Sequence, residues 1–360
     1  MASYARREWF LALLVLLYLF LSVVDPSLPG RSLHLIDYES LAAIVSLLAV
    51  SRGIELSGIF SRIAPGLIRL SNGSEWRLMV LLTLTTALSS AFIMNDTAMF
   101  IFVPLVVMIS RITGMNTGKA VTLTAIAANV GSAMTPIGNP QNIIIWRTYK
   151  VSIHDFVLNM LPYVLAWMII LLLFVYLAGS KKRIQSFTMP RIKINRLLLA
   201  ASMILLITDV ILIQLGYAFI GLVATLIVLA LLGREAILSV DVALIAIFAL
   251  IFVDFGEISL LISSLGHTLF HKNSLTIIVM AAGLSQATSN VPATVMLLPT
   301  RPPWLPLTLG VNLGGTGIII GSLANFIALR ISRTGMGQFH KYSLPYFLVA
   351  LLVTLLIFVL

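Results

Sequence analysis

Of the 360 residues in the chain, 59% are hydrophobic and only 10% are charged, which is too little charge for the surface of a soluble protein of this length. The net charge of +10 does not indicate nucleic-acid binding, because Lys and Arg are concentrated in short loops between apolar segments, as in membrane proteins. The chain has no cysteine, which excludes disulfides and thiolate metal sites.

The first apolar segment follows Arg6 and Arg7. No small-x-small cleavage motif comes after it, since the chain continues with Asp25-Pro26-Ser27, so we interpret it as an uncleaved helix. Further apolar segments recur to the end of the chain and predict an all-α integral membrane protein with about nine spanning helices. These lie near residues 9–25, 39–60, 118–149, 155–178, 197–215, 217–233, 236–262, 304–332 and 343–360.

Two more apolar segments, 76–110 and 274–299, are each interrupted by polar residues near the middle. The interruptions are Asn95-Asp96-Thr97 and Ser289-Asn290. The shorter arms fall below the roughly 20 residues that a spanning helix needs. The pattern therefore predicts two re-entrant hairpins, each of which returns to the side from which it enters.

The segment 179–196 is basic and contains no acidic residue. Because positive residues favour the cytoplasmic side, it is predicted to be a cytoplasmic linker between a first half (1–178) and a second half (197–360). The same argument predicts the plasma membrane as the location, with the N-terminus inside and the C-terminus outside. The two halves then have opposite orientations.

Matching intervals in the two halves indicate an internal repeat. The hairpins match at a constant offset of 195, and the later broken helices match at an offset of 183. The first set pairs Ser90, Asn95, Ala98 and Pro104 with Ser285, Asn290, Ala293 and Pro299. The second pairs Asn129, Gly131, Gly138, Asn142 and Arg147 with Asn312, Gly314, Gly321, Asn325 and Arg330. Inverted repeats of this kind are typical of alternating-access transporters, whose site lies at the repeat interface.

The segments 118–149 and 304–332 each contain a run that cannot continue a helix. The first run, 131–140, has two prolines and two glycines, and the second, 314–322, is rich in glycine. Unwound backbone at membrane depth is tolerated only where it is buried or lines a polar cavity. Two broken helices are therefore predicted beside the two hairpins.

Each interruption also starts a half-helix, at Asn95, Asn139-Pro140, Asn290 and Ser322. A helix N-terminus carries about half a positive charge, so four of them around one cavity favour an anionic or strongly polar substrate. Unwound carbonyls and Ser, Thr, Asn and Asp oxygens suit a Na⁺ ion beside it.

At these motifs the chain resembles the ion transporter superfamily, which contains arsenite permeases, D-type sodium/proton antiporters and divalent anion–sodium symporters. The resemblance extends from about Asp37 to Arg333. It is clearest in Asn95-Asp96-Thr97-Ala98, NVGSAMTPIGNPQN (129–142), SNVPA (289–293) and NLGGTGIIIGSLAN (312–325). It implies a transport domain that moves against a dimeric scaffold, and hence a homodimer.

The resemblance also implies which residues form the site. The expected substrate-binding residues are Asn95, Thr97, Thr135, Asn139, Ser289, Asn290, Thr316 and Ser322. The expected cation-binding residues, for Na⁺, are Ser90, Asn95, Asp96, Gly138, Ser285, Asn290, Gly315 and Gly321. No organic cofactor is expected, and the coupling ion is Na⁺ or H⁺.

Several acidic residues lie inside apolar segments. A charged Asp96 near mid-bilayer would cost roughly 2.5–3.5 kcal/mol, which favours a role as cation ligand or proton carrier over a simple helix cap. Asp254 and Glu257 lie one helical turn apart and are further candidates for proton coupling, unless they lie at the membrane boundary. Asp209 is predicted either to pair with an arginine of a neighbouring helix or to take part in coupling.

The sequence therefore predicts an inverted-repeat secondary transporter for a small anion or polar oxyanion such as a carboxylate or arsenite. The leading alternative is a Na⁺/H⁺ antiporter that uses Asp96 as the exchanging carboxylate. An intramembrane enzyme is disfavoured because all five histidines fall in loops or at the ends of apolar segments. An ungated channel is the remaining alternative.

Overall fold

The computed structural model describes residues 9–178, 194–240, 242–264 and 273–359, and these are helical with no β-strand. The first half contains α2 (Trp9–Val24), α3 (Leu28–Leu35), α4 (Tyr38–Leu56), α5 (Ile59–Leu70), α6 (Glu75–Ser90), α7 (Asn95–Thr113), α8 (Thr117–Ser132), α9 (Pro140–Tyr149) and α10 (Ile153–Ala178). The second half contains α11 (Arg196–Gln214), α12 (Ala218–Leu232), α13 (Arg234–Leu238), α14 (Val242–Ser264), α15 (Ser274–Thr288), α16 (Asn290–Leu297), α17 (Trp304–Gly314), α18 (Leu323–Ser332) and α19 (Met336–Val359), with short 3₁₀ turns η2 (Leu298–Thr300) and η3 (Ile319–Gly321).

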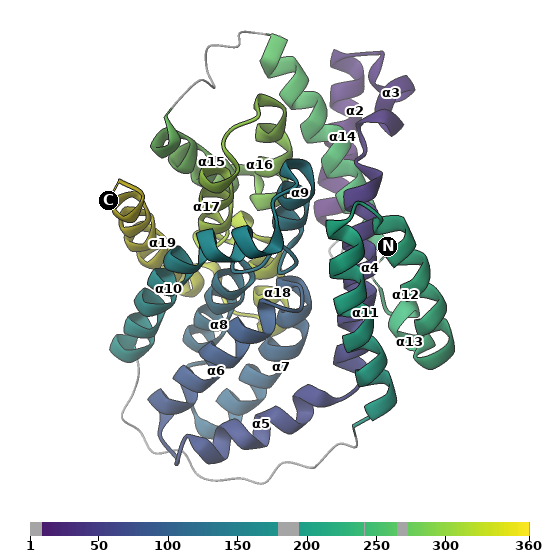
Figure 1. Ribbon diagram of the computed structural model, residues 1–360. Helices are drawn as coiled ribbons and strands as arrows, with labels where there is room; N and C mark the ends of the chain where they lie inside the picture. The colour runs from purple at the N-terminus through teal and green to yellow at the C-terminus, as the bar shows by residue number, and fades with distance from the viewer. Residues whose placement is uncertain (1–8, 179–193, 241, 265–272, 360) are drawn as a thin grey trace.

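The helices form two bundles that lie side by side (Figure 1). We call α2–α4 and α11–α14 the scaffold bundle, and α6–α10 with α15–α19 the hairpin bundle. In the scaffold bundle, α4 packs against α11 and α12, and α14 packs against α2 and α3. Helix α14 also packs against α16, so it forms part of the contact between the bundles. Helix α5 runs from the end of α4 toward α6 (Figure 1).

The hairpin bundle has the same packing in both halves of the chain. Helix α6 packs against α8 as α15 packs against α17. The second arms of the broken helices are exchanged between the halves, because α9 packs against α16 and α17, and α18 packs against α7 and α8. Helices α10 and α19 pack against each other. The two halves thus have matched packing and interlock with each other, and their inversion across the membrane stays a prediction.

Both broken helices are interrupted where predicted, between α8 and α9 and between α17 and α18. Close packing against the hairpins explains two of the glycines. A Cβ atom on Gly131 would lie 2.0 Å from the Ala87 carbonyl oxygen of α6. A Cβ on the equivalent Gly314 would lie 2.3 Å from the Cβ of Ser285 in α15. Each broken helix is therefore in direct backbone contact with the first arm of its own hairpin.

Among the described helices, α10, α11, α19 and residues 242–261 of α14 are each long and apolar enough to cross a bilayer. The bent pair α3–α4, with an angle of 57° between its helices, could add a fifth span. The nine-span count therefore stays a prediction, and most of the basic linker (179–193) lies outside the described residues.

Some predicted boundaries are wrong. The span predicted at 39–60 ends at Leu56, because Gly58 adopts a positive φ of 81° and redirects the chain into α5. The short helices α3 and α13 were not predicted as separate elements, since their apolar residues merge with those of longer neighbours in any hydropathy window.

Candidate substrate and cation site

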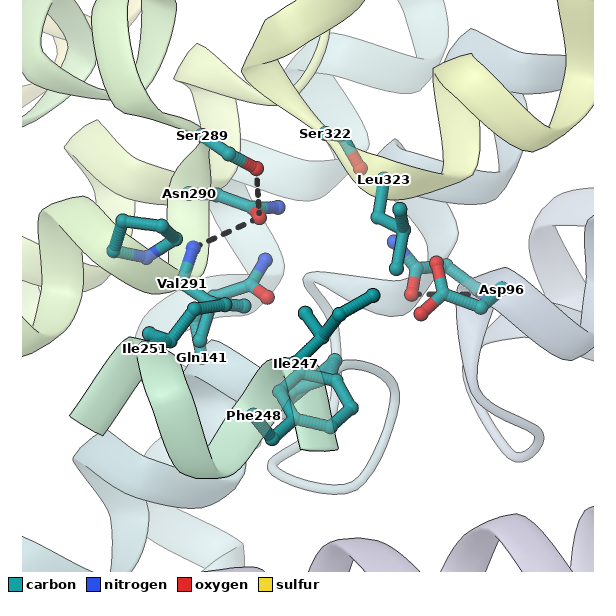
Figure 2. A pocket seen from close by; sticks show the side chains of 13 residues that line it. Asp96, Gln141, Ile247, Phe248, Ile251, Ser289, Asn290, Val291, Ser322 and Leu323 are labelled. Carbon is teal, nitrogen blue, oxygen red and sulfur yellow. Dashed lines mark hydrogen bonds between the residues drawn. The ribbon is translucent and has the colours of Figure 1, made fainter. Parts of the chain in front are cut away.

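A small cavity lies where the hairpin bundle meets α14 (Figure 2). Its polar side comes from the first residues of α7, α9, α16 and α18, which are the four half-helices predicted from the sequence. Its apolar wall is formed by Ile247, Phe248 and Ile251 of α14. The space open to the centre of a water molecule is about 20 Å³, which is room for about one water.

The four half-helices direct their N-termini toward this region, and the first N–H groups of each have no partner within their own helix. Some of these groups are capped by asparagine side chains. Asn139 Oδ1 accepts the amide N–H of Asn142 at 3.0 Å. At the hairpin tips, Asn95 Oδ1 accepts from the amide of Asp96 at 3.0 Å, and Asn290 Oδ1 accepts from the amide of Val291 at 2.9 Å. The remaining N–H groups and the helix dipoles favour negative charge in the cavity.

The first hairpin tip is tied to the broken helix beside it. The backbone N–H of Asn95 donates to the Gly138 carbonyl at 2.9 Å. The Asn95 side-chain Nδ2 donates to Asn129 Oδ1 of α8 at 3.0 Å. Thr135 Oγ1, in the unwound segment, donates to the Ala91 carbonyl of the tip at 2.5 Å. Tip and unwound segment therefore form one unit.

The second hairpin tip is tighter and less fully bonded. Ser289 alone separates α15 from α16 and has a φ of 86° and a ψ of 157°, a conformation that costs a residue other than glycine about 1–3 kcal/mol. Asn290 lines the cavity, and its Nδ2 donates to no acceptor in the described part of the chain. In place of tip contacts, Gln286 of α15 binds the second unwound segment, through the Gly314 carbonyl (2.5 Å) and the Ile318 amide (2.7 Å).

Two asparagines cross between the repeats behind the cavity. Asn129 of the first half donates to Asn325 Oδ1 of the second half at 2.8 Å. Its counterpart Asn312 donates to Asn142 Oδ1 of the first half at 2.6 Å. The cavity-lining Ser322 donates to Asn129 Oδ1 at 2.9 Å, and Asn139 donates to Asn312 Oδ1 at the same distance. Each residue in one set of crossed bonds lies 183 positions from the residue in the same place in the other set.

The partners Asn142 and Asn325 also satisfy carbonyls that the helix breaks leave free. Asn142 Nδ2 donates to the carbonyls of Thr135 (2.9 Å) and Ser132 (3.3 Å). Asn325 Nδ2 donates to the equivalent carbonyls of Ile318 (3.2 Å) and Gly315 (2.8 Å). These amides therefore replace the helical hydrogen bonds that are lost at each break.

Asp96 lines the cavity and is 3% exposed. Among the described residues, no group donates a hydrogen bond to its carboxyl oxygens. Gln141 of α9 also lines the cavity, and its buried Oε1 accepts no hydrogen bond from any residue that the structure describes. Unpartnered oxygens of this kind suit a hard cation such as Na⁺ or a bound proton.

The structure places five of the predicted site residues in the cavity wall, namely Asn95, Asp96, Ser289, Asn290 and Ser322. The other predicted residues lie behind the wall. The hydroxyls of Ser90, Ser285 and Thr316 donate to backbone carbonyls of their own turns, and Thr97 is buried. The Gly138 carbonyl accepts one protein hydrogen bond and retains a second lone pair, whereas the Gly315 carbonyl accepts two, from the side-chain amides of Asn129 and Asn325. Gly321 lets the unwound backbone approach the end of α17, because a Cβ there would lie 2.4 Å from the Gly314 carbonyl oxygen.

The remaining acidic residues differ from one another in their surroundings. Glu257 pairs with Arg31, whereas both oxygens of the buried Asp254 have no partner among the residues that the structure describes. The predicted pairing of Asp209 with an arginine is wrong. Its Oδ2 accepts from Ser46 (2.5 Å) and Thr225 (3.1 Å), because these hydroxyls reach it from α4 and α12.

Other charged residues pair within the membrane-facing bundles. Arg52 and Glu55, one turn apart within α4, form an ion pair at 2.5 Å. Arg147, near the end of α9, pairs with Glu39 of α4 at 3.0 Å and thereby connects the two bundles.

Sequence reasoning missed the role of five amides near the site: Asn129, Gln141, Asn142, Asn312 and Asn325. Four of them had been recognised only as markers of the repeat. Their matched spacing was the available signal, because a buried amide that recurs at both breaks is suited to replace lost backbone bonds. Gln141 had no such signal, since Ala324 occupies the equivalent position.

Two matched halves whose broken helices meet at a buried polar cavity are typical of membrane transporters. A family model described as a citrate transporter (CitMHS) matches residues 3–301. The chain belongs to this citrate transporter family, within the ion transporter superfamily. It is a membrane transporter and not an enzyme.

Individual relatives agree with this assignment. The chain is 36% identical to the inner membrane protein YbiR of Escherichia coli over 356 residues, which cover 97% of this chain and 95% of YbiR. It is 28% identical to an uncharacterized transporter of Methanocaldococcus jannaschii over 321 residues, 88% and 87% of the two chains. The fold is similar to that of the YdaH transporter of Alcanivorax borkumensis, with a TM-score of 0.54, 14% identity, and coverage of 97% of this chain and 96% of that one.

Proposed function

We propose that the protein is a secondary active transporter that moves a small anion or polar oxyanion, coupled to Na⁺ or H⁺, by alternating access. The observation that carries this proposal is the convergence of four half-helix N-termini on one cavity between the repeats. Their dipoles favour an anionic or polar cargo without requiring a charged side chain.

The side chains around the cavity favour a cargo of low charge. Of the described residues, no Lys or Arg lines the cavity, and Asp96 adds a carboxyl that none of them partners. A tricarboxylate would need more positive charge than four helix termini supply, unless a cation accompanied it. We therefore favour a monoanion or a largely protonated oxyacid, with Asp96 holding the coupling cation or proton.

Movement of the hairpin bundle against α14 is part of the proposal. A cavity with room for about one water cannot hold even a small carboxylate, so Ile247, Phe248 and Ile251 must separate from the half-helix termini to admit cargo. The crossed asparagine bonds support movement of the hairpin bundle as a unit, because they join its two repeats. Assembly as a homodimer through the scaffold bundle belongs to the same proposal.

A ligand screen tests the proposal. Purified protein is heated with arsenite, phosphate, sulfate, and di- and tricarboxylates, each with and without Na⁺, and every stabilising compound is then assayed for uptake into proteoliposomes. We expect at least one small oxyanion to raise the melting temperature and to be transported. A screen in which only Na⁺ and pH have an effect would contradict anion transport.

The second candidate is a Na⁺/H⁺ antiporter with Asp96 as the exchanging carboxylate. The unpartnered carboxyl in the cavity wall favours it. Proteoliposomes that contain a pH-sensitive dye separate the two functions. Sodium-driven proton movement in the absence of any anion supports the antiporter, and movement only after an anion is added supports the anion transporter.

A further inference from the structure

Asp254 is a buried acidic residue in the middle of α14, outside the cavity wall. Its side chain is fully buried, and neither carboxyl oxygen has a hydrogen-bond partner in the described part of the chain. It lies one helical turn after the cavity-lining Ile251, on the same side of the helix. Within the described ranges it caps no helix and is in no ion pair, so the packing there gives the carboxyl no structural role.

Glu257, one turn further along α14, is in a different situation. Both of its oxygens accept from Arg31 Nη2, at 2.7 and 2.8 Å, and Arg31 also binds Asp25. This cluster joins α14 to α3 by charge and explains why an acid is present at position 257. The sequence pattern grouped Asp254 and Glu257 as one candidate pair, but the structure separates them.

The elements packed on α14 offer Asp254 no compensating charge. On α2 the only titratable side chain is Tyr18, which bonds Ser32, and α16 has none. On α3, Arg31 is held by Glu257 and Asp25, and His34 is exposed. The charged residues of α4 are paired elsewhere, in Arg52–Glu55 and Glu39–Arg147, and its Tyr38 is exposed.

An ionised carboxylate without a partner is costly in a buried, membrane-spanning position, whereas the neutral acid is much less so. This packing of α14 is therefore compatible with Asp254 only when a proton is bound. In a second conformation, in which water or a hydrogen-bond donor reaches Asp254, the ionised carboxylate would be stable. Because the packed conformation binds the proton more tightly than the second conformation does, proton binding shifts the equilibrium toward the packed one.

We propose that Asp254 is a proton-binding site that controls the packing of α14 against α16. With the proton bound, α14 stays packed and the apolar wall of the cavity is closed. Loss of the proton loosens the contact and opens the wall. The role of Asp254 in transport rests on the proposed function, in which this apolar wall must move for cargo to enter.

Ser259 provides a reporter for the contact. Its Oγ donates to the Met296 carbonyl at 2.8 Å and so bridges α14 and α16, and the side chain is buried. Because the chain has no cysteine, Ser259→Cys introduces a single thiol at this contact. The rate of its reaction with a maleimide, measured in nanodiscs across a range of pH, reports how often α14 and α16 separate.

The informative quantity is the ratio of labelling rates between Ser259→Cys and Ser259→Cys/Asp254→Asn at each pH. Ionisation of the thiol and loss of the serine hydrogen bond affect the labelling rates of both variants equally, so they cancel in the ratio. We expect a ratio near one at low pH that rises several-fold as the pH increases. Asp254→Leu, a second neutral replacement, is expected to behave like Asp254→Asn and serves if the latter does not fold.

Two outcomes overturn the proposal. A ratio that stays near one means that Asp254 does not control the contact, and any pH dependence common to both chains then belongs to another group such as Asp96. A pH dependence that survives Asp254→Asn but is lost in Glu257→Gln would assign the proton to Glu257. Labelling needs no substrate, so failure to find a transported anion would contradict the proposed function without changing this result.

Discussion

The side-chain amide of Asn95 donates to Asn129 at 3.0 Å, whereas the amide of its repeat counterpart Asn290 has no acceptor among the described residues. The difference arises at Asn312, the counterpart of Asn129. Its Oδ1 already accepts from Asn139 at 2.9 Å and from Gln141 at 3.3 Å. Both side-chain N–H groups of Asn290 are therefore without an acceptor among the described residues, whereas one of the two N–H groups of Asn95 is bonded to Asn129.

Replacement of either tip asparagine by alanine should reduce transport, with different effects on stability. For Asn290→Ala we expect binding of a polar cargo to weaken about tenfold or more, since a hydrogen bond to a charged group contributes about 1.5–3 kcal/mol. The melting temperature should change little. Asn95→Ala should reduce transport and also lower the melting temperature, because Asn129 loses a donor. Equal melting temperatures for the two variants would contradict the predicted difference in bonding, and unchanged transport in both would show that the site lies elsewhere.

The crossed asparagines should be needed for stability. Asn129→Ala removes the partner of Asn95, Ser322 and Asn325, and a buried polar group without a partner costs about 1–3 kcal/mol. We expect a loss of about 2 kcal/mol or more, with Asn312→Ala similar, measured by thermal unfolding in detergent. The control is Asn159→Ala, which changes an exposed asparagine of α10. Losses no larger than the control's would contradict the prediction.

Asp96→Asn distinguishes a cation ligand from an exchanging carboxylate. An amide still offers an oxygen to Na⁺, so a cation-ligand role predicts weaker Na⁺ dependence with some substrate binding retained. An amide cannot carry a proton, so the antiporter role predicts complete loss of Na⁺/H⁺ exchange. We expect the first result, measured as substrate binding over a Na⁺ titration and as dye-reported proton flux.

The movement of the hairpin bundle against α14 can be stopped by a cross-link. Ile247 and Leu323 line the cavity from α14 and α18, one in each bundle. Joining Ile247→Cys to Leu323→Cys with a short cleavable reagent should abolish transport, and cleavage should restore it. The cysteine-free native chain, treated in the same way, is the control. Full transport by cross-linked protein would exclude relative movement at this wall.

The orientation in the membrane is open to a direct test. A reporter fused at Gln185 should be cytoplasmic, and one placed after Leu360 should be outside, because the basic linker favours the inner side. A cysteine introduced at Met189 should react only with a reagent supplied from the cytoplasmic side. Labelling of this cysteine only from outside would reverse the predicted orientation.

The helix breaks could be predicted from the sequence because their causes are local. Pro136, Pro140 and the neighbouring glycines lie so close together that a helix cannot continue through them, and Asn139 is a cap by residue type and position. Repeat spacing then located the second break. The bend at Gly58 was missed because apolar residues continue through it, and hydropathy does not register a change in direction.

Contacts between the halves could not be predicted in this way. An offset of 183 positions pairs Asn129 with Asn312 as equivalents but does not show that each binds the other half's partner, Asn325 or Asn142. Periodicity likewise placed Asp254 and Glu257 on one face of a helix, but only the position of α3 shows that Arg31 reaches Glu257.

The exchange of α9 and α18 between the repeats has a consequence for how the chain is made. When the first half has been synthesised, α9 has not yet met α16 and α17, and the amides of Asn129 and Asn142 lack their partners. Unpaired polar groups are costly in lipid, so this half must wait in a sheltered or partly inserted state until the second half arrives. The crossed bonds between the halves are thus completed only after synthesis of α18, which carries Asn325.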